Sequence, residues 1–304
     1  MRIKNILLSA LIAAGCIFGM TACSSDGGAS DNSGTNSTSA PGNSYDPSDS
    51  SDPDSGAVSG SDIAGNVGDI TPQKGDLIAE IEINGFGTIR AVLFPDAAPT
   101  GVENFRLLAE DGYYNGLTIH RVVSDFMFQG GSLNGDGTGG DALVNGGSFG
   151  IETDSNVRHF YGALCYANAM GTNTTQFYIV NNKQPQELGG DYSNIYAYAD
   201  QYEQAANSAS TDIEKEYYSF QADYYRNMAS SAENATEDIK NKYKEVGGTP
   251  SLDGNYTVFG QVYEGFDVIE SVSAVKVEDN GMGEVSKPVQ EITISSVKVY
   301  EFEG

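Results

Sequence analysis

The chain has 304 residues, enough for one large domain or two small ones, and its 39% hydrophobic and 10% aromatic residues can form a core without any tryptophan. Its formal net charge of −26 argues against nucleic-acid binding, because a phosphate backbone calls for clustered Lys and Arg. Such acidity is instead typical of an exposed protein that stays soluble and repels anionic surfaces.

Residues 1–22 are predicted to be a targeting segment. A basic start precedes an apolar stretch over 6–20 that is too short for a stable transmembrane helix. The small residues before Cys23 resemble the lipobox of bacterial lipoproteins, in which this cysteine is acylated; an ordinary signal peptide is the alternative. The resemblance implies an extracytoplasmic protein, lipid-anchored to the bacterial cell membrane on its outer face or its periplasmic side.

Residues 23–75 are rich in Ser, Gly, Asp, Asn and Pro, and Tyr45 is their one aromatic residue. This composition cannot bury enough surface to offset the entropy of ordering, so we expect a disordered tether. With Cys16 removed and Cys23 lipidated, Cys165 is left alone, and the mature domain can form no internal disulfide.

A folded domain is expected over 76–304. Alternating apolar residues over 77–83 and 88–94 flank a turn-forming Asn-Gly-Phe-Gly and predict an antiparallel hairpin. Thr100 and Glu103 then form a predicted capping box at the start of a helix.

The segment 120–131 brings together an unusual set of side chains. Arg121 opens a short apolar strand, and Phe126, Met127 and Gln129 follow just before a glycine pair. No nucleophile, metal-ligand cluster or carboxylate pair accompanies them in the segment. One reaction suited to this set is rotation about an X-Pro amide, in which no covalent bond is made or broken.

Further strand-like runs cover 162–167, 176–180, 256–262 and 292–300, with a short helix near 266–273. Many short strands with few helices and long Gly-rich loops predict a mainly β fold. We expect a closed antiparallel β-barrel capped by helices.

Residues 183–250 interrupt this pattern. Thr211 and Glu214 form a second capping box, and apolar residues recur at helical spacing from Ile213 to Met228. A helical hairpin or small bundle inserted into a barrel loop is expected. Its tyrosine-rich stripe is either an internal packing surface or a contact surface for a client, and the sequence leaves both open.

Several motifs in this part of the chain occur together, in order and at family-like spacing. They lie at 94–99, 102–105, 112–116, 120–131, 137–140, 167–169, 176–179, 252–254 and 259–260. In this arrangement they resemble the cyclophilin family of peptidyl-prolyl isomerases. The resemblance covers residues 76–304 except the insertion, and the number of motifs makes it specific.

The resemblance implies a closed eight-stranded barrel capped by two helices, with catalytic residues Arg121 and Gln129. It also implies a monomer that needs no cofactor or metal and that acts on X-Pro polypeptides folding after export. The implied substrate-binding residues are Phe126, Met127, Ala167, Asn168, Ala169, Gln176, Tyr178, Leu252 and Tyr256.

Four departures from the family pattern affect the rim of the expected pocket. Tyr178 replaces a phenylalanine, Ser251 a frequent tryptophan, and Tyr256 a frequent histidine. The loop 169–173 is one residue shorter than usual and lacks Gly-Pro. These changes leave specificity open, whereas Arg121 and Gln129 are retained.

Other chemistries find less support. The two histidines, at 120 and 159, lack a pattern of Cys or acidic ligands for zinc, and Ser124 lacks the glycine context of a nucleophile elbow. Cys165 is expected to be a buried strand residue. The alternative to an isomerase is a proline-directed binding module or chaperone without significant turnover.

Overall fold

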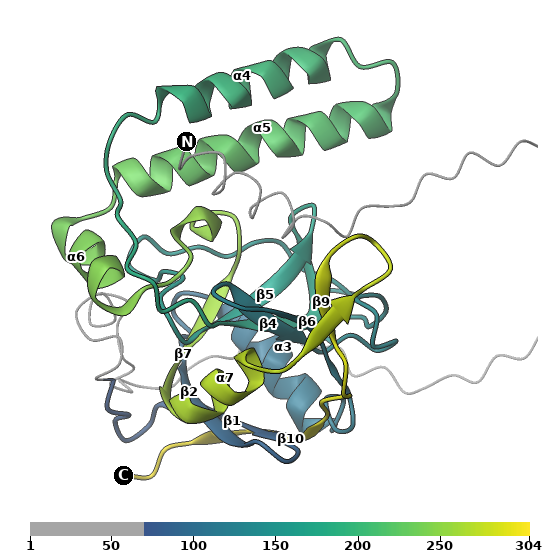
Figure 1. Ribbon diagram of the computed structural model, residues 1–304, viewed down its shortest axis with the longest axis vertical. Helices are drawn as coiled ribbons and strands as arrows, with labels where there is room; N and C mark the ends of the chain where they lie inside the picture. Colours follow the sequence, from purple (N-terminus) through teal and green to yellow (C-terminus); the bar gives the residue numbers. More distant parts are fainter. Residues whose placement is uncertain (1–69) are drawn as a thin grey trace, which may run out of the picture. The chain divides into compact units, whose positions relative to one another are not determined.

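The computed structural model describes residues 70–304, whose strands and helices are arranged as Figure 1 shows. The predicted lipidation site at Cys23 and nearly all of the predicted tether lie outside these residues. The strands of the main sheet are Leu77–Ile83 (β1), Gly87–Leu93 (β2), Ile119–Val123 (β3), Met127–Gly130 (β4), Ala163–Ala169 (β5), Thr172–Val180 (β6), Val258–Glu264 (β7) and Ile294–Glu301 (β10).

These eight strands form one antiparallel sheet in the order β10-β1-β2-β7-β5-β6-β4-β3. Its edge strands β3 and β10 share no ladder in the described range and meet through a bridge between Thr118 and Thr293. A second hairpin, Val277–Asp279 (β8) and Val285–Pro288 (β9), packs against β3. The mainly β, eight-stranded architecture is therefore confirmed. The expected closure is not, because within residues 70–304 the two edges are joined only at one end, by the Thr118–Thr293 bridge and the backbone hydrogen bonds between residues 116–119 and 292–294.

The first hairpin forms as predicted. β1 and β2 pair from Ile78 with Val92 to Ile83 with Gly87. Gly85 has a φ of +79° in the connecting turn, a conformation that glycine adopts without steric strain.

Two helices, Pro99–Glu110 (α3) and Phe266–Ser273 (α7), pack against the sheet. The capping box expected at Thr100 is wrong, because α3 begins at Pro99 and its N-cap residue is Ala98. The backbone N–H groups of Thr100 and Gly101 instead donate to the Glu152 carboxylate, at 3.0 and 2.9 Å. A carboxylate from a distant loop thus satisfies the first turn of the helix.

Three further helices lie between β6 and β7: Ser193–Asn207 (α4), Asp212–Glu233 (α5) and Glu237–Val246 (α6). α4 and α5 run side by side (Figure 1). The capping box at the start of α5 is confirmed, since Thr211 Oγ1 accepts from the Glu214 N–H at 3.2 Å and the Glu214 carboxylate accepts from the Thr211 N–H at 3.2 Å.

The apolar face predicted for α5 is correct only in its C-terminal half. Tyr224 and Met228 are buried, whereas Ile213 and Tyr217 are 67% and 39% exposed. The buried half packs into an apolar cluster that also contains Phe126 and other side chains of the sheet. The insertion is therefore joined to the sheet through its own core residues.

The end of the insertion returns to the sheet at Gly248, which forms a bridge with Phe160. Gly248 has a φ of +131°, and a Cβ there would lie 2.3 Å from the His159 carbonyl oxygen. We expect Gly248→Ala to lower the free energy of unfolding by about 3 kcal/mol or more, measured by urea denaturation. Gly85→Ala is the matched control, with a φ of +79° and open space around the added methyl; an equal loss in both variants would contradict the steric explanation.

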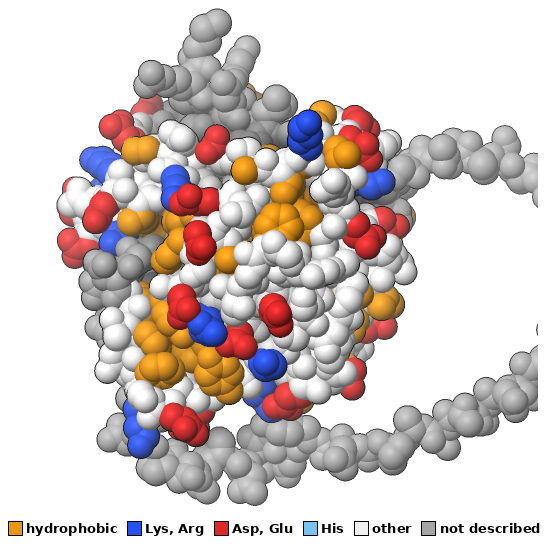
Figure 2. Space-filling view, turned by 60° about the horizontal axis from the view of Figure 1, so that its bottom comes forward, with side chains coloured by type: hydrophobic (Ala, Val, Ile, Leu, Met, Phe, Trp, Pro, Cys, Tyr) orange, Lys and Arg blue, Asp and Glu red, His pale blue; other side chains and the backbone are white. Residues whose placement is uncertain are grey.

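The surface mixes charged and uncharged side chains. On the face in Figure 2, acidic groups are scattered among Lys, Arg and uncharged residues and do not gather into one patch. Among residues 70–304, no helix combines the length and apolar character needed to cross a membrane.

Candidate active site

The segment 120–131 contains most of the predicted strand, β3, a turn at 124–126 and a second short strand, β4, that was not predicted. Asp125 adopts a φ of +55° in the turn between them. The Asn181 side chain holds this turn: its Oδ1 accepts from the Phe126 N–H at 2.7 Å, and its Nδ2 donates to the Val123 carbonyl at 3.1 Å. Asn181 was not anticipated, since an asparagine after a strand is an ordinary turn residue.

A small cavity of about 20 Å³ opens beside this hairpin. Its lining combines one cation, one amide and an apolar wall. The lining residues lie on β3, β4, β5 and β6, in the turn between β3 and β4, and in the loop before β7. Its lining residues are Arg121, Phe126, Met127, Gln129, Ala167, Tyr178, Leu252 and Tyr256. Every one of these belongs to the predicted site, so the fold brings together residues that lie up to 135 positions apart (256 − 121 = 135).

A chain of side-chain amides orients the polar edge of the cavity. Arg121 Nη1 donates to Gln129 Oε1 at 3.4 Å, and Gln129 Nε2 donates to Gln176 Oε1 at 2.9 Å. Gln176 Nε2 in turn donates to the Gly137 carbonyl at 2.9 Å. Gln176 therefore lies behind the cavity wall, where it fixes the direction of the Gln129 amide.

Aromatic rings form the deep wall. Tyr178 and Tyr256 meet edge to face with their centroids 6.1 Å apart, and His159 stacks behind Tyr178 at 6.1 Å. Burial raises the pKa of the Tyr178 hydroxyl well above its ordinary value. Cys165 is a buried residue of β5, as predicted, and this burial raises the pKa of its thiol.

Asn168 and Ala169 do not line the cavity. At the end of β5, their backbones pair with Asn173 and Thr172 of β6. The Asn168 side chain donates from Nδ2 to the Asn255 carbonyl at 3.0 Å. It braces the loop before β7, a role that the sequence did not indicate.

The same loop, which begins with the short helix Pro250–Leu252 (η1), is also held by α5. The Tyr224 hydroxyl donates to the Ser251 carbonyl at 3.3 Å, and Asn255 Nδ2 donates to the Tyr224 carbonyl at 3.0 Å. Asn227 Nδ2 adds a hydrogen bond to Asn255 Oδ1 at 3.3 Å. The insertion thus supports the loop that supplies Leu252 and Tyr256 to the cavity.

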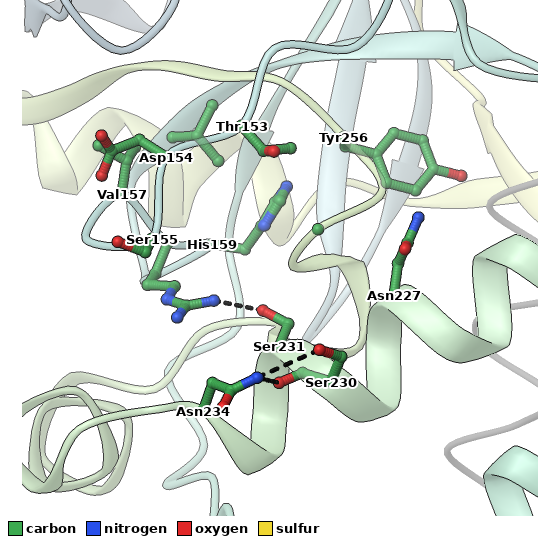
Figure 3. A pocket seen from close by; sticks show the side chains of 13 residues that line it. Thr153, Asp154, Ser155, Val157, His159, Asn227, Ser230, Ser231, Asn234 and Tyr256 are labelled. Carbon is green, nitrogen blue, oxygen red and sulfur yellow. Dashed lines mark hydrogen bonds between the residues drawn. The ribbon is translucent and has the colours of Figure 1, made fainter.

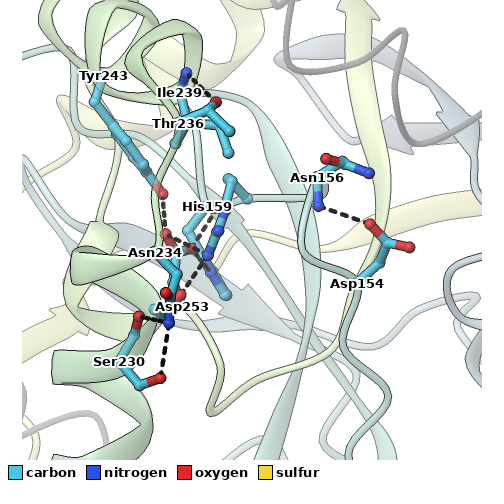
Figure 4. Close-up of polar contacts among 11 residues, drawn as sticks. Asp154, Asn156, His159, Ser230, Asn234, Thr236, Ile239, Tyr243 and Asp253 are labelled. Atoms are coloured by element: carbon cyan, nitrogen blue, oxygen red, sulfur yellow. Dashed lines mark hydrogen bonds and ion pairs between the residues drawn. The ribbon is translucent and has the colours of Figure 1, made fainter.

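Asp253 is the buried centre of this support (Figure 4). Its Oδ1 accepts from the His159 backbone N–H at 3.0 Å and lies 2.8 Å from His159 Nδ1, while its Oδ2 accepts from the Tyr243 hydroxyl at 2.7 Å. Arg158 Nη1 lies 3.7 Å from Oδ2. The carboxylate therefore joins α6, the segment before β5 and the cavity loop.

A second cavity, of about 290 Å³, lies between residues 153–159 and the C-terminal half of α5 (Figure 3). Arg158 is one of the residues that line it, and its Nη1 donates to Ser231 Oγ. Tyr256 lines both cavities, so the two are adjacent.

The β8–β9 hairpin supplies a carboxylate to the site. Glu284 Oε2 accepts from Arg121 Nε and Glu284 Oε1 accepts from Arg121 Nη2, each at 2.7 Å. Burial opposes ionisation of this carboxyl, but its hydrogen bonds and the Arg121 charge outweigh burial and lower its pKa. Glu284 was not predicted, since a lone acid in a Gly-rich turn carries no recognisable signal.

Comparison with known proteins shows the family of this chain. The family model described as "Cyclophilin type peptidyl-prolyl cis-trans isomerase/CLD" matches residues 78–299. A "Putative peptidyl-prolyl cis-trans isomerase" of Staphylococcus saprophyticus is 35% identical over 234 residues, 76% of this chain and 96% of that protein. A protein of the same name from Staphylococcus aureus (strain USA300) is 33% identical over 232 residues, 75% of this chain and 94% of that protein.

Among solved structures, a cyclophilin-type isomerase of Cryptosporidium parvum is similar to this chain with a TM-score of 0.49 and 20% identity, over 75% of this chain and 99% of that one. The family match spans most of the chain and includes the strands that build the small cavity. The chain belongs to the cyclophilin-type peptidyl-prolyl cis-trans isomerases.

Proposed function

We propose that this isomerase rotates X-Pro bonds with Arg121 as the donor to the prolyl imide nitrogen and with the small cavity as the seat of the proline ring. The observation that carries the proposal is the placement of one guanidinium and one fixed amide on the rim of an otherwise apolar cavity. No covalent step, metal or cofactor enters the mechanism.

The physical task is to lower a rotational barrier. Amide resonance sets that barrier at about 18–20 kcal/mol and makes the spontaneous X-Pro flip take tens to hundreds of seconds. Rotation breaks the resonance and leaves a lone pair on the nitrogen. A donor aimed at that nitrogen stabilises the twisted state more than either planar state, and an arginine remains charged at any working pH.

The apolar wall of the cavity would hold the pyrrolidine ring. Met127 is the wall residue best suited to adapt to the ring, because its side chain is unbranched and flexible.

We further propose that the clients are exported polypeptides and that the backbone near Asn168 holds them as an added strand. The supporting features are the targeting segment, the lipobox at Cys23 and the polar tether over 23–75. These would hold the catalytic domain, residues 76–304, away from the membrane's outer face.

Exchange NMR on a peptide containing Ala-Pro, with and without the purified protein, tests the activity. We expect the cis and trans signals to interconvert much faster when the protein is added at catalytic concentration. A rate equal to the uncatalysed one, with binding still detected, would favour the proline-directed binding module without turnover.

A further inference from the structure

The carboxylate of Glu284 meets Arg121 in the strongest geometry available to the pair. Both oxygens are used, at 2.7 Å each, on the Nε and Nη2 side of the guanidinium. The Arg121 and Glu284 side chains are 14% and 17% exposed, so the pair is largely shielded from solvent. Fork-to-fork pairing of this kind adds geometric specificity as well as energy.

The turn that carries Glu284 is built to hold it. The Asn280 N–H donates to the Glu284 carbonyl at 2.9 Å, and Asn280 Oδ1 accepts from the Glu284 N–H at 3.3 Å. Gly281 and Gly283, with φ of +87° and +88°, allow the chain to turn within these few residues. Glu284 therefore enters the site from a closed loop whose ends are the paired strands β8 and β9.

The pairing also sets the direction of the guanidinium. With Nε and Nη2 directed at Glu284, Nη1 lies on the side of Gln129 Oε1, at 3.4 Å, and of Met127 Sδ, at 3.9 Å. The Arg121 Cζ lies 5.8 Å from the Phe126 ring centroid. Glu284 is not among the residues that line the cavity, so it holds the arginine from behind and does not stand in the path of the ring.

We propose that Glu284 is a positioning residue for Arg121 in the isomerase reaction, a role that rests on the proposed function of that arginine. A free arginine side chain loses rotamer entropy when it is fixed in one geometry. The Glu284 fork fixes it before substrate arrives, so that this cost is not added to the barrier of rotation. The carboxylate orients the N–H donors without removing Nη1 from the cavity side.

Steady-state kinetics on an Ala-Pro peptide test the proposal. We expect Glu284→Ala to lower kcat by about 10-fold or more with a smaller change in KM, the size of effect seen when a partner that orients a functional side chain is removed. Glu284→Gln keeps one acceptor oxygen and should recover part of the loss. Glu278→Ala is the matched control, because Glu278 belongs to the same hairpin and pairs with Lys287 at 3.8 Å, away from Arg121; its kcat should match wild type.

The outcomes separate the two proposals. Unchanged or raised kcat in both Glu284 variants, with thermal unfolding as in wild type, overturns positioning; a rise would show that the carboxylate restrains the enzyme. The Arg121 Nε–H signal in ¹⁵N NMR gives an independent readout and should be protected from exchange in wild type but not in Glu284→Ala. If wild type shows no turnover while this protection is present and lost in the variant, the proposed function of Arg121 fails and the contact stands.

Discussion

Arg121→Ala is expected to lower kcat/KM for an Ala-Pro peptide by about 10²- to 10³-fold, the usual loss when one pre-organised donor is removed from a developing charge or lone pair. The loss should fall mainly on kcat, since the donor acts on the twisted state and the apolar walls bind the ring in every state. The free energy of unfolding should fall as well, because the variant leaves the largely shielded Glu284 carboxylate without its partner. Exchange NMR and urea denaturation measure the two effects separately.

Two controls sharpen this result. Arg90 is also a strand arginine with two carboxylate partners, Glu80 at 2.9 Å and Glu264 at 2.5 Å, but it lies outside the cavity. Arg90→Ala should leave kcat/KM at the wild-type level. Arg121→Lys keeps the charge but loses the planar fork, so the kcat/KM of this variant should remain well below that of wild type. A kcat/KM equal to that of wild type would show that the charge alone suffices and that oriented N–H groups do not matter.

The cavity could be predicted from the sequence because its residues lie in short motifs that resemble those of a known family. Phe126, Met127 and Gln129 lie on β4 or next to it, and Ala167 and Tyr178 lie on paired strands. The residues alone grouped only the members of the segment 120–131, and the resemblance implied the others. The structure brings together eight of the eleven catalytic and substrate-binding residues that were predicted, and it places Asn168, Ala169 and Gln176 outside the cavity lining.

What escaped prediction depends on contacts between segments that no local pattern connects. Glu284 reaches Arg121 across 163 positions, and Glu152 caps α3 from 52 positions away. The exposure of Ile213 has a similar cause, because helical spacing predicts a face but not how far along the helix a neighbour extends. The packing of β9 against β3 is another contact of this kind, because no local pattern connects these two strands.

The insertion supports the loop before β7, which supplies Leu252 and Tyr256 to the cavity, through two of its helices. Its α5 hydrogen-bonds to Ser251 and Asn255, and its α6 supplies Tyr243 to Asp253. The tyrosine-rich segment therefore has a packing role in its buried half, whatever its exposed half contacts. It follows that changes in the insertion should reach the cavity through Asp253.

Asp253→Ala is the sharpest test of that link. Removal of the carboxylate leaves the His159 donors, the Tyr243 hydroxyl and the buried Arg158 charge without their acceptor, and breaking such a buried ionic contact typically costs about 3–5 kcal/mol of unfolding free energy. Because Asp253 lies between Leu252 and Tyr256, we also expect KM for an Ala-Pro peptide to rise, measured at a temperature where the variant stays folded.

Two tyrosine variants isolate the contribution of the insertion. Tyr243→Phe removes one buried donor to Asp253 and should cost about 1–2 kcal/mol of unfolding free energy, with a smaller rise in KM. Tyr196→Phe is the matched control: its hydroxyl also donates to a carboxylate, Glu233 at 2.8 Å, but on an exposed surface of the insertion, so its effect should stay within about 0.5 kcal/mol. Tyr196 makes this hydrogen bond to Glu233 and not to Asp253. Equal effects of the two variants on KM would therefore contradict the view that α6 supports the cavity through Asp253.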